Sequence, residues 1–276
     1  MVTNAGSSIQ PVSWDRHQAW SWHGPKGFAH ARCLRSVPIT LHEAASAASC
    51  FPLVFVPGPS GPTPHALLRR GAQGHSPFIG REGQWQASWL PPRLAAWPFD
   101  LVATQGGGHA LALHEESDLV EPEPGGHPIF AQSGDAHVLA PETARMAAIL
   151  RAQAENLPAT AQATAALADL GLLTELDADP SLSIIDPQAA ANLDEAGVLA
   201  LHRSGALTLL HAGLVSLAHL VWMAKAERHL TTAPPPRPSP SADRQRKADG
   251  SRFLAALAAD ASADDALIQL PELTRQ

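Results

Sequence analysis

Fourteen histidines are the residues of this chain best suited to chemistry, either as metal ligands or as proton carriers. A zinc site needs ligands at close spacing, such as a C-x2-C pair or H-E-x-x-H on one helix. The sequence contains neither pattern, and its two His-Glu pairs, His42-Glu43 and His114-Glu115, both lack the second histidine. We therefore predict no metal site and no cofactor, and interpret most histidines as solvated or hydrogen-bonded side chains.

Nucleophilic residues also lack a recognisable setting. No G-x-S-x-G motif occurs, and neither Cys33 nor Cys50 belongs to an active-site pattern. The stretch QGGGHA at 105–110 has the glycines of a phosphate loop without its Gly-Lys-Ser/Thr ending, so we interpret it as a turn. One disulfide between the cysteines is possible, although two free thiols are the default. The residues therefore show no catalytic constellation.

Aromatic residues gather in EGQWQASWLPPRLAAWPF, residues 82–99, which holds three of the seven tryptophans of a chain without tyrosine. Trp85 and Trp89 are four residues apart and would share one face of a strand. Grouped tryptophans usually form the edge of a core, and the alternative is an aromatic groove for a peptide, sugar or small ligand. Trp85, Trp89, Trp97 and Phe99 are therefore candidate ligand contacts.

Charge and the first residues exclude other classes of protein. The net charge is −7 and the basic residues are scattered, whereas a nucleic-acid partner would require a basic stripe. The opening MVTNAGSSIQPVSW has no basic region followed by an apolar run, so we expect no secretory signal and a cytoplasmic location.

The N-terminal part, residues 10–140, reads as short strands and turns. Apolar or β-branched runs predict strands at 36–41, 51–56, 99–104 and 109–114, with two more within 127–140. Residues 76–80 and 85–90 flank REGQ and predict a hairpin in which Gly83 takes a positive φ. The Ala-rich run at 42–50 predicts two helical turns.

The C-terminal part, residues 141–230, reads as helical. Pro141 begins a helix that Pro158 should kink or divide and Gly171 should cap. A strand is expected at 181–186, and a short helix at 192–205 between Asn192 and Gly205.

An uncharged run of nineteen residues, 206–224, is near the minimum length for a membrane span. Its histidines, alcohols and glycine favour a buried core helix, continuing to about residue 229. The stripe Leu207, Leu210, Leu214, Leu217 and Val221, with an apolar opposite side, predicts a central helix. His211 and His219 should find partners in that core, and a ligand role for His211 stays open.

Residues 231–276 form a tail rich in proline, serine and charge, which predicts disorder. The run RFLAALAAD at 252–260 predicts one short amphipathic helix. It is either a frayed end or a segment that docks on a partner.

Four fragments in order resemble the SapC family of bacterial proteins, over about residues 10–229. They are VPITLHEAASAASCFPLVF, REGQWQASWLPPRLAAWPF, PIFAQSG and LHRSGALTLLHAGLVSLAHL. The resemblance also singles out His17, which matches a histidine that the family carries early in its sequence. Trp89 and Trp97 stand where the family tends to carry tyrosine, and Ala131 stands where it favours an acid. These departures weaken any mechanism that needs a phenol or a carboxylate there.

The resemblance implies an accessory role in uptake, modification or a surface layer, and it supplies no catalytic residues. We expect a non-enzymatic protein that binds a peptide or protein partner or an envelope component, either in the cytoplasm or in association with the envelope. One alternative is a metal-dependent, oxygenase-like peptide-modifying enzyme with a histidine site, and another is a structural surface-layer protein. The expected fold is α+β, with a mostly antiparallel N-terminal sheet packed on C-terminal helices around the central apolar helix, in one domain over 10–230.

Overall fold

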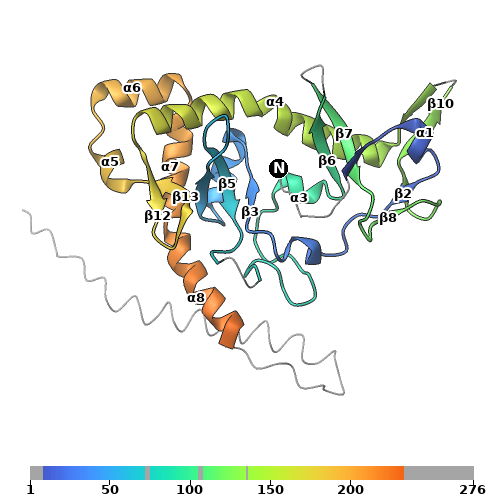
Figure 1. Ribbon diagram of the computed structural model, residues 1–276, viewed down its shortest axis with the longest axis horizontal. Helices are drawn as coiled ribbons and strands as arrows, with labels where there is room; N and C mark the ends of the chain where they lie inside the picture. Colours follow the sequence, from blue (N-terminus) through green and yellow to red (C-terminus); the bar gives the residue numbers. More distant parts are fainter. Residues whose placement is uncertain (1–8, 72–74, 105–107, 135, 233–276) are drawn as a thin grey trace, which may run out of the picture. The chain divides into compact units, whose positions relative to one another are not determined.

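A computed structural model describes residues 9–71, 75–104, 108–134 and 136–232 (Figure 1). The chain divides into two units, Met1–Thr232 and Ala233–Gln276, and every described element belongs to the first. The elements are, in chain order, β1 (Ile9–Pro11), α1 (Trp14–His17), β2 (Ser21–Trp22), η1 (Ala29–Ala31), β3 (Ser36–Pro38), η2 (Leu41–Glu43), α2 (Ala44–Ala48), β4 (Leu53–Val56), β5 (Thr63–Leu67), α3 (Pro92–Ala95), β6 (Phe99–Ala103), β7 (His109–His114), β8 (Val120–Glu121), β9 (His127–Pro128), β10 (Phe130–Ser133), β11 (Ala136–Leu139), α4 (Pro141–Asp169), β12 (Leu173–Leu176), β13 (Asp179–Ile185), α5 (Pro187–Ala191), α6 (Glu195–Arg203), α7 (Ala206–Ser216) and α8 (Ala218–Thr232).

The fold is α+β, as predicted, and the strands of the described residues pair antiparallel. They form several small sheets instead of one: β12-β13-β4-β5-β3, β1-β7-β6, β8-β2-β9 and the hairpin β10-β11. The five-stranded sheet takes two strands from the C-terminal half, where β13 pairs with β4 through Ser183 and Phe55. The expectation that N-terminal residues supply the sheet on their own was therefore incomplete.

The first core lies between the five-stranded sheet and α7, which contacts α2, α4, α6, β4 and β13. The hydroxyl of Ser216 accepts from the Leu53 N–H at 2.9 Å and donates to the Gly213 carbonyl at 2.7 Å, all within the protein interior. A Cβ on Gly213 would lie 2.4 Å from Cγ1 of Ile185, so only glycine lets α7 approach β13 this closely. Small residues therefore set the packing distance of this helix.

The central helix differs from the prediction in two respects. It ends at Ser216 and resumes as α8 at Ala218. Its buried face holds small residues beside leucines, so it is turned relative to the predicted stripe, and Val215 and Val221 are 67% and 64% exposed. His211 is exposed, which corrects its expected place in the core, whereas His219 Nε2 lies 2.9 Å from the Ala48 carbonyl oxygen.

No single described helix is both long and apolar enough to cross a membrane. The pair α6 and α7 meets that requirement only when joined, across a bend of 106°.

The second core gathers Trp22, Phe99, Leu113 and Ile129 against α4. The Trp22 indole N–H donates to the Thr143 hydroxyl at 2.8 Å, and both side chains are buried. In Figure 1, α4 runs from α6 and α7 to β6, so one helix contributes to both cores.

The ends of α4 follow local sequence signals. Pro141 occupies the first turn, and Gly171 takes φ +63° just beyond the last turn, so both predictions are confirmed. The Gly171 N–H donates to the Ala168 carbonyl and the Leu172 N–H to the Leu167 carbonyl, which is the Schellman pattern. Pro158 lies inside the helix without dividing it, so the expected division is wrong.

Other local predictions had mixed outcomes. Strands occur within 36–41, 51–56, 99–104, 109–114 and 127–140, and β13 covers most of 181–186 but begins two residues earlier. The helical residues expected at 42–50 are the 3-10 turn η2 and the short helix α2, which together cover residues 41–48. The hairpin at 76–90 is reduced to one bridge, Ile79 to Trp85, although Gly83 takes φ +87° as expected. The cap of α6 is Asp194, which accepts from the Gly197 N–H at 2.8 Å, and not Asn192. The helix expected at 252–260 lies outside the described residues.

Candidate ligand-binding site

Three cavities surround residues 147–157 of α4, and we refer to them together as the α4 hollow. The central cavity, of about 100 Å³, lies between α4, β6 and the segment that joins β3 to η2. One flanking cavity, of about 290 Å³, shares Leu101, His109 and Ala154 with the central one. The other, of about 440 Å³, shares Thr40 and Gln153 with it. The shared residues show that the three cavities lie next to one another along α4.

The hollow arises where the two cores fail to meet under α4. Leu150 belongs to the second core, whereas Ile39 and Leu94 belong to the first, and Leu150 and Ile39 both line the central cavity. The central cavity is therefore a gap between side chains of the two clusters beside α4. The gap receives polar side chains from α3, β6 and β7.

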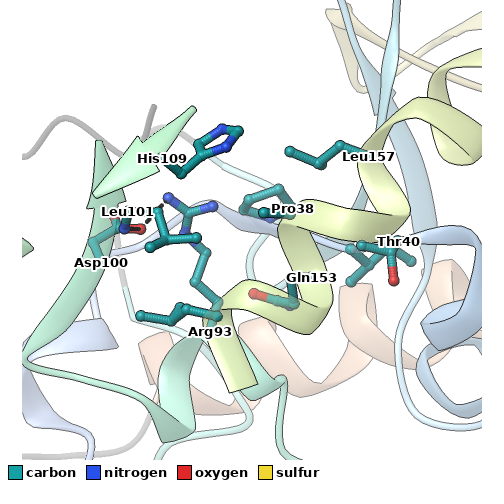
Figure 2. A pocket seen from close by; sticks show the side chains of 11 residues that line it. Pro38, Thr40, Arg93, Asp100, Leu101, His109, Gln153 and Leu157 are labelled. Atoms are coloured by element: carbon teal, nitrogen blue, oxygen red, sulfur yellow. Dashed lines mark hydrogen bonds and ion pairs between the residues drawn. The ribbon is translucent and has the colours of Figure 1, made fainter. Parts of the chain in front are cut away.

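An ion pair forms one wall of the central cavity. The Arg93 guanidinium on α3 donates to the Asp100 carboxylate on β6 at 2.5 Å, and the same oxygen accepts from the Leu101 N–H at 2.8 Å. Figure 2 shows Arg93 and Asp100 side by side, and His109 is another residue that lines the cavity. Because Asp100 holds one edge of the guanidinium, Arg93 is oriented before any ligand arrives.

A glutamine on α4 forms the opposite wall. The Gln153 amide nitrogen donates to Glu43 at 2.9 Å, and the other oxygen of Glu43 accepts from the Thr40 N–H at 2.7 Å. A carboxylate accepts hydrogen bonds and does not donate them, which fixes the orientation of the Gln153 amide. The amide oxygen is therefore the atom that Gln153 turns away from Glu43, and it is drawn at the free end of the side chain in Figure 2.

The flanking cavities have different linings. The larger is walled mainly by apolar side chains from α3, α4 and the preceding segment: Leu90, Pro92, Ala95, Ile149 and Ala152. The smaller combines the apolar Leu111 and Leu139 with the charged Arg151 and Glu155. The hollow thus offers an ion-paired centre between two wider arms, of which the larger is lined mainly by apolar side chains and the smaller by apolar and charged ones.

The predicted tryptophans do not line the hollow. Trp85 and Trp89 pack together against Phe51, and the Trp85 indole N–H donates to the Trp89 carbonyl at 3.0 Å. Trp97 is stacked between two histidines, His30 at 4.8 Å and His114 at 4.3 Å between ring centroids. These rings occupy two separate places, and both have intramolecular partners.

The other predicted residues are also separate. Phe99 is buried edge-on to Trp22 at 5.0 Å, next in sequence to Asp100. His17 is fully buried, and its Nε2 lies 3.0 Å from Glu115. Arg16 binds the same carboxylate through two nitrogens, and this lowers the pKa of Glu115 below its ordinary value. His211 is exposed on α7.

Sequence reasoning missed Arg93, Asp100 and Gln153, the residues that give the hollow its polar centre. A weak signal existed, because Arg93 and Asp100 stand within the apolar stretch LPPRLAAWPFD. Gln153 had no signal, since it is one of several polar residues on a long helix.

Among residues 9–71, 75–104, 108–134 and 136–232, no three His, Cys, Asp or Glu side chains gather closely enough to hold a metal ion. Cys33 and Cys50 are free thiols. Burial raises the pKa of the Cys50 thiol, but hydrogen bonds from Ser49, Ser88 and the Trp89 backbone outweigh it, so the pKa is below its ordinary value.

The fragments that resembled a known family are supported by a direct comparison. A family model described as SapC matches residues 12–222, well over half of the chain. No curated protein and no solved structure matches the chain. The matched range contains the whole α4 hollow and all six residues singled out from the sequence. The chain therefore belongs to the SapC family.

Proposed function

We propose that this chain is a non-enzymatic binding protein that holds a peptide-like ligand in the α4 hollow. The observation that carries the proposal is the adjacency of the three cavities along α4, with the Arg93–Asp100 pair lining the central one. Ligand sites are concave, mostly apolar and furnished with a few placed polar groups. An extended peptide matches this layout because its backbone is polar and its side chains lie to either side.

The polar groups of the hollow favour binding over catalysis. Arg93 is held by Asp100, and Gln153 is held by Glu43. Each pair fixes the geometry of a donor or an acceptor, which lowers the entropic cost of binding. Neither pair joins a nucleophile to a base, the arrangement that acyl or phosphoryl transfer requires.

The proposed cellular role is an accessory one in a bacterial uptake, modification or surface-layer system, exercised from the cytoplasm or at the envelope. Membership of the SapC family supports this role to the extent that the resemblance set out in the sequence analysis implies it. Cell fractionation tests it: recovery of the native protein outside the cell, in an isolated surface layer, would contradict a cytoplasmic accessory role and favour a structural one.

The binding proposal is tested by selecting peptides from a random display library and measuring their affinity by fluorescence polarisation. Ala152→Phe would fill the larger arm and Ala154→Phe the centre and the smaller arm, because these alanines line those cavities. We expect each variant to weaken binding at least tenfold. Ala161→Phe, on an exposed position of the same helix, is the matched control.

Two results would overturn the proposal. One is that no peptide is enriched by the wild-type protein. The other is that both cavity-filling variants, shown by circular dichroism to be folded, bind the selected peptides as well as Ala161→Phe does.

A further inference from the structure

We propose that the central cavity of the α4 hollow binds a neutral carboxamide, the planar group of a peptide bond or of an acetamido substituent. This inference rests on the proposed function and adds the chemistry of the group that anchors the ligand. It follows from the donors, acceptors, charge and size of one small cavity.

The donors come from Arg93. One of its nitrogens donates to Asp100. No hydrogen bond joins its other nitrogens to a described residue, and they are not among the buried atoms left unpaired. They are therefore accessible, on a side chain that lines the cavity. A guanidinium edge presents N–H groups in one plane, which suits the lone pairs of a carbonyl oxygen.

The acceptors come from α4. The orientation of Gln153 turns its amide oxygen away from Glu43, on a side chain that lines the cavity. Ala154 also lines the cavity, and its carbonyl lacks the usual intrahelical donor because Pro158 has no N–H. A group bound between Arg93 and α4 therefore has to accept on one side and donate on the other.

Charge separates a carboxamide from its charged analogues. Arg93 and Asp100 are the two charged residues of opposite sign that line the central cavity, and their formal charges cancel. A carboxylate would place an oxygen against the Gln153 oxygen and near Asp100, where it has nothing to donate. An amidinium would match these acceptors but would face the Arg93 guanidinium with a like charge.

The size of the central cavity limits the part of the ligand inside it to one such group. One water needs about 10–15 Å³ of cavity, so the central cavity, at about 100 Å³, admits a group of several heavy atoms. Whole ligands of drug size occupy about 300 Å³ or more. The rest of the ligand therefore has to lie in the flanking arms, which are wider.

Three isosteric probes test the inference: acetamide, acetate and acetamidinium, titrated separately into the ¹⁵N-labelled full chain. The readouts are the Leu101 backbone N–H beside Asp100 and the side-chain NH₂ of Gln153. We expect acetamide to shift both signals saturably and to bind at least tenfold more tightly than either charged probe. Acetate or acetamidinium binding as tightly as acetamide would overturn the inference.

A substitution tests the acceptor side separately. Gln153→Met keeps the side-chain length and removes the amide, so we expect acetamide binding, followed at Leu101, to weaken at least fivefold. Gln188→Met, an exposed glutamine on α5, is the matched control and should leave it unchanged. If Gln153→Met loses its fold, the probe series on the wild-type protein still decides the question.

Two larger probes distinguish the sources of the carboxamide: N-acetylglycinamide represents a peptide and N-acetylglucosamine a sugar. We expect the peptide probe to bind more tightly. Tighter binding of the sugar would support the carboxamide and contradict a peptide ligand. The two proposals can fail separately. If library peptides bind in the flanking arms but the hollow does not prefer acetamide over the charged probes, the binding proposal stands and the inference of a carboxamide site is overturned.

Discussion

A hydrogen bond between Trp22 and Thr143 fastens the second core to α4, and its removal gives a sharp test of the fold. The Trp22 N–H donates to the Thr143 hydroxyl at 2.8 Å, and that hydroxyl donates to the Pro128 carbonyl at 3.1 Å. Trp22 is 3% exposed and Thr143 is fully buried. Thr143→Val would keep the shape of the side chain and leave the indole N–H without an acceptor.

The expected cost follows from what the substitution leaves behind. A buried donor without a partner costs about 1–3 kcal/mol, and replacing the hydroxyl by a methyl group returns up to about 0.8 kcal/mol through apolar burial. The net loss in the free energy of unfolding should be about 1–2 kcal/mol. For a unit of this size, the melting temperature should fall by about 2–8 °C.

Urea denaturation followed by circular dichroism measures the loss, with Thr164→Val as the matched control. Thr164 lies on the same helix and is equally buried, but its hydroxyl only donates to the Thr160 carbonyl one turn earlier. Its replacement leaves no donor unpaired, so its cost should be smaller. In a Trp22→Phe background, the indole N–H is already gone, and Thr143→Val should cost about 1 kcal/mol less than in the wild type.

Equal losses for Thr143→Val and Thr164→Val would refute the reasoning. So would strict additivity in the double-mutant cycle, because the two side chains would then not be coupled.

Two further predictions concern ionisation. The Cys50 thiolate accepts hydrogen bonds from Ser88 and its neighbours, so Ser88→Ala should raise the pH midpoint of Cys50 alkylation by iodoacetamide, and an unchanged midpoint would contradict the assignment. Burial lowers the pKa of His65 from 6.5 to about 4. Above pH 6.5 the imidazole is neutral in both the folded and the unfolded state, so it does not affect the free energy of unfolding. Below pH 6.5 it becomes protonated in the unfolded state but stays neutral in the folded state. The free energy of unfolding therefore falls as the pH falls toward 4, by about 3 kcal/mol at most. His65→Gln should flatten this part of the curve of unfolding free energy against pH, and a curve parallel to that of the wild type would disprove the assignment.

Local features of the fold were predictable where neighbouring residues decide the conformation. The hairpins β6-β7 and β10-β11 lie where turn residues separate β-forming runs. The ends of α4 follow Pro141 and Gly171, because each residue controls its own backbone and the adjacent hydrogen bonds. The strands predicted around REGQ did not form, since after the bridge at Trp85 the chain folds onto Phe51 and soon meets Pro91.

The orientation of the central helix was not predictable. Its sequence is apolar around most of its circumference, so periodicity could not choose a buried face. The five-stranded sheet made the choice, because Gly213 allows close contact with Ile185 and Ser216 satisfies the Leu53 N–H. His211 consequently points to solvent.

By itself, the sequence determined the α+β class, the family and the positions of most elements, because these depend on composition and on near neighbours in the chain. Only the tertiary structure decided which residues line the α4 hollow. Arg93, Asp100 and Gln153 come from three different elements, and they face one cavity because α4 bridges two cores that do not touch beneath it. Such a gap is a property of packing between distant segments, which no local pattern of residues encodes.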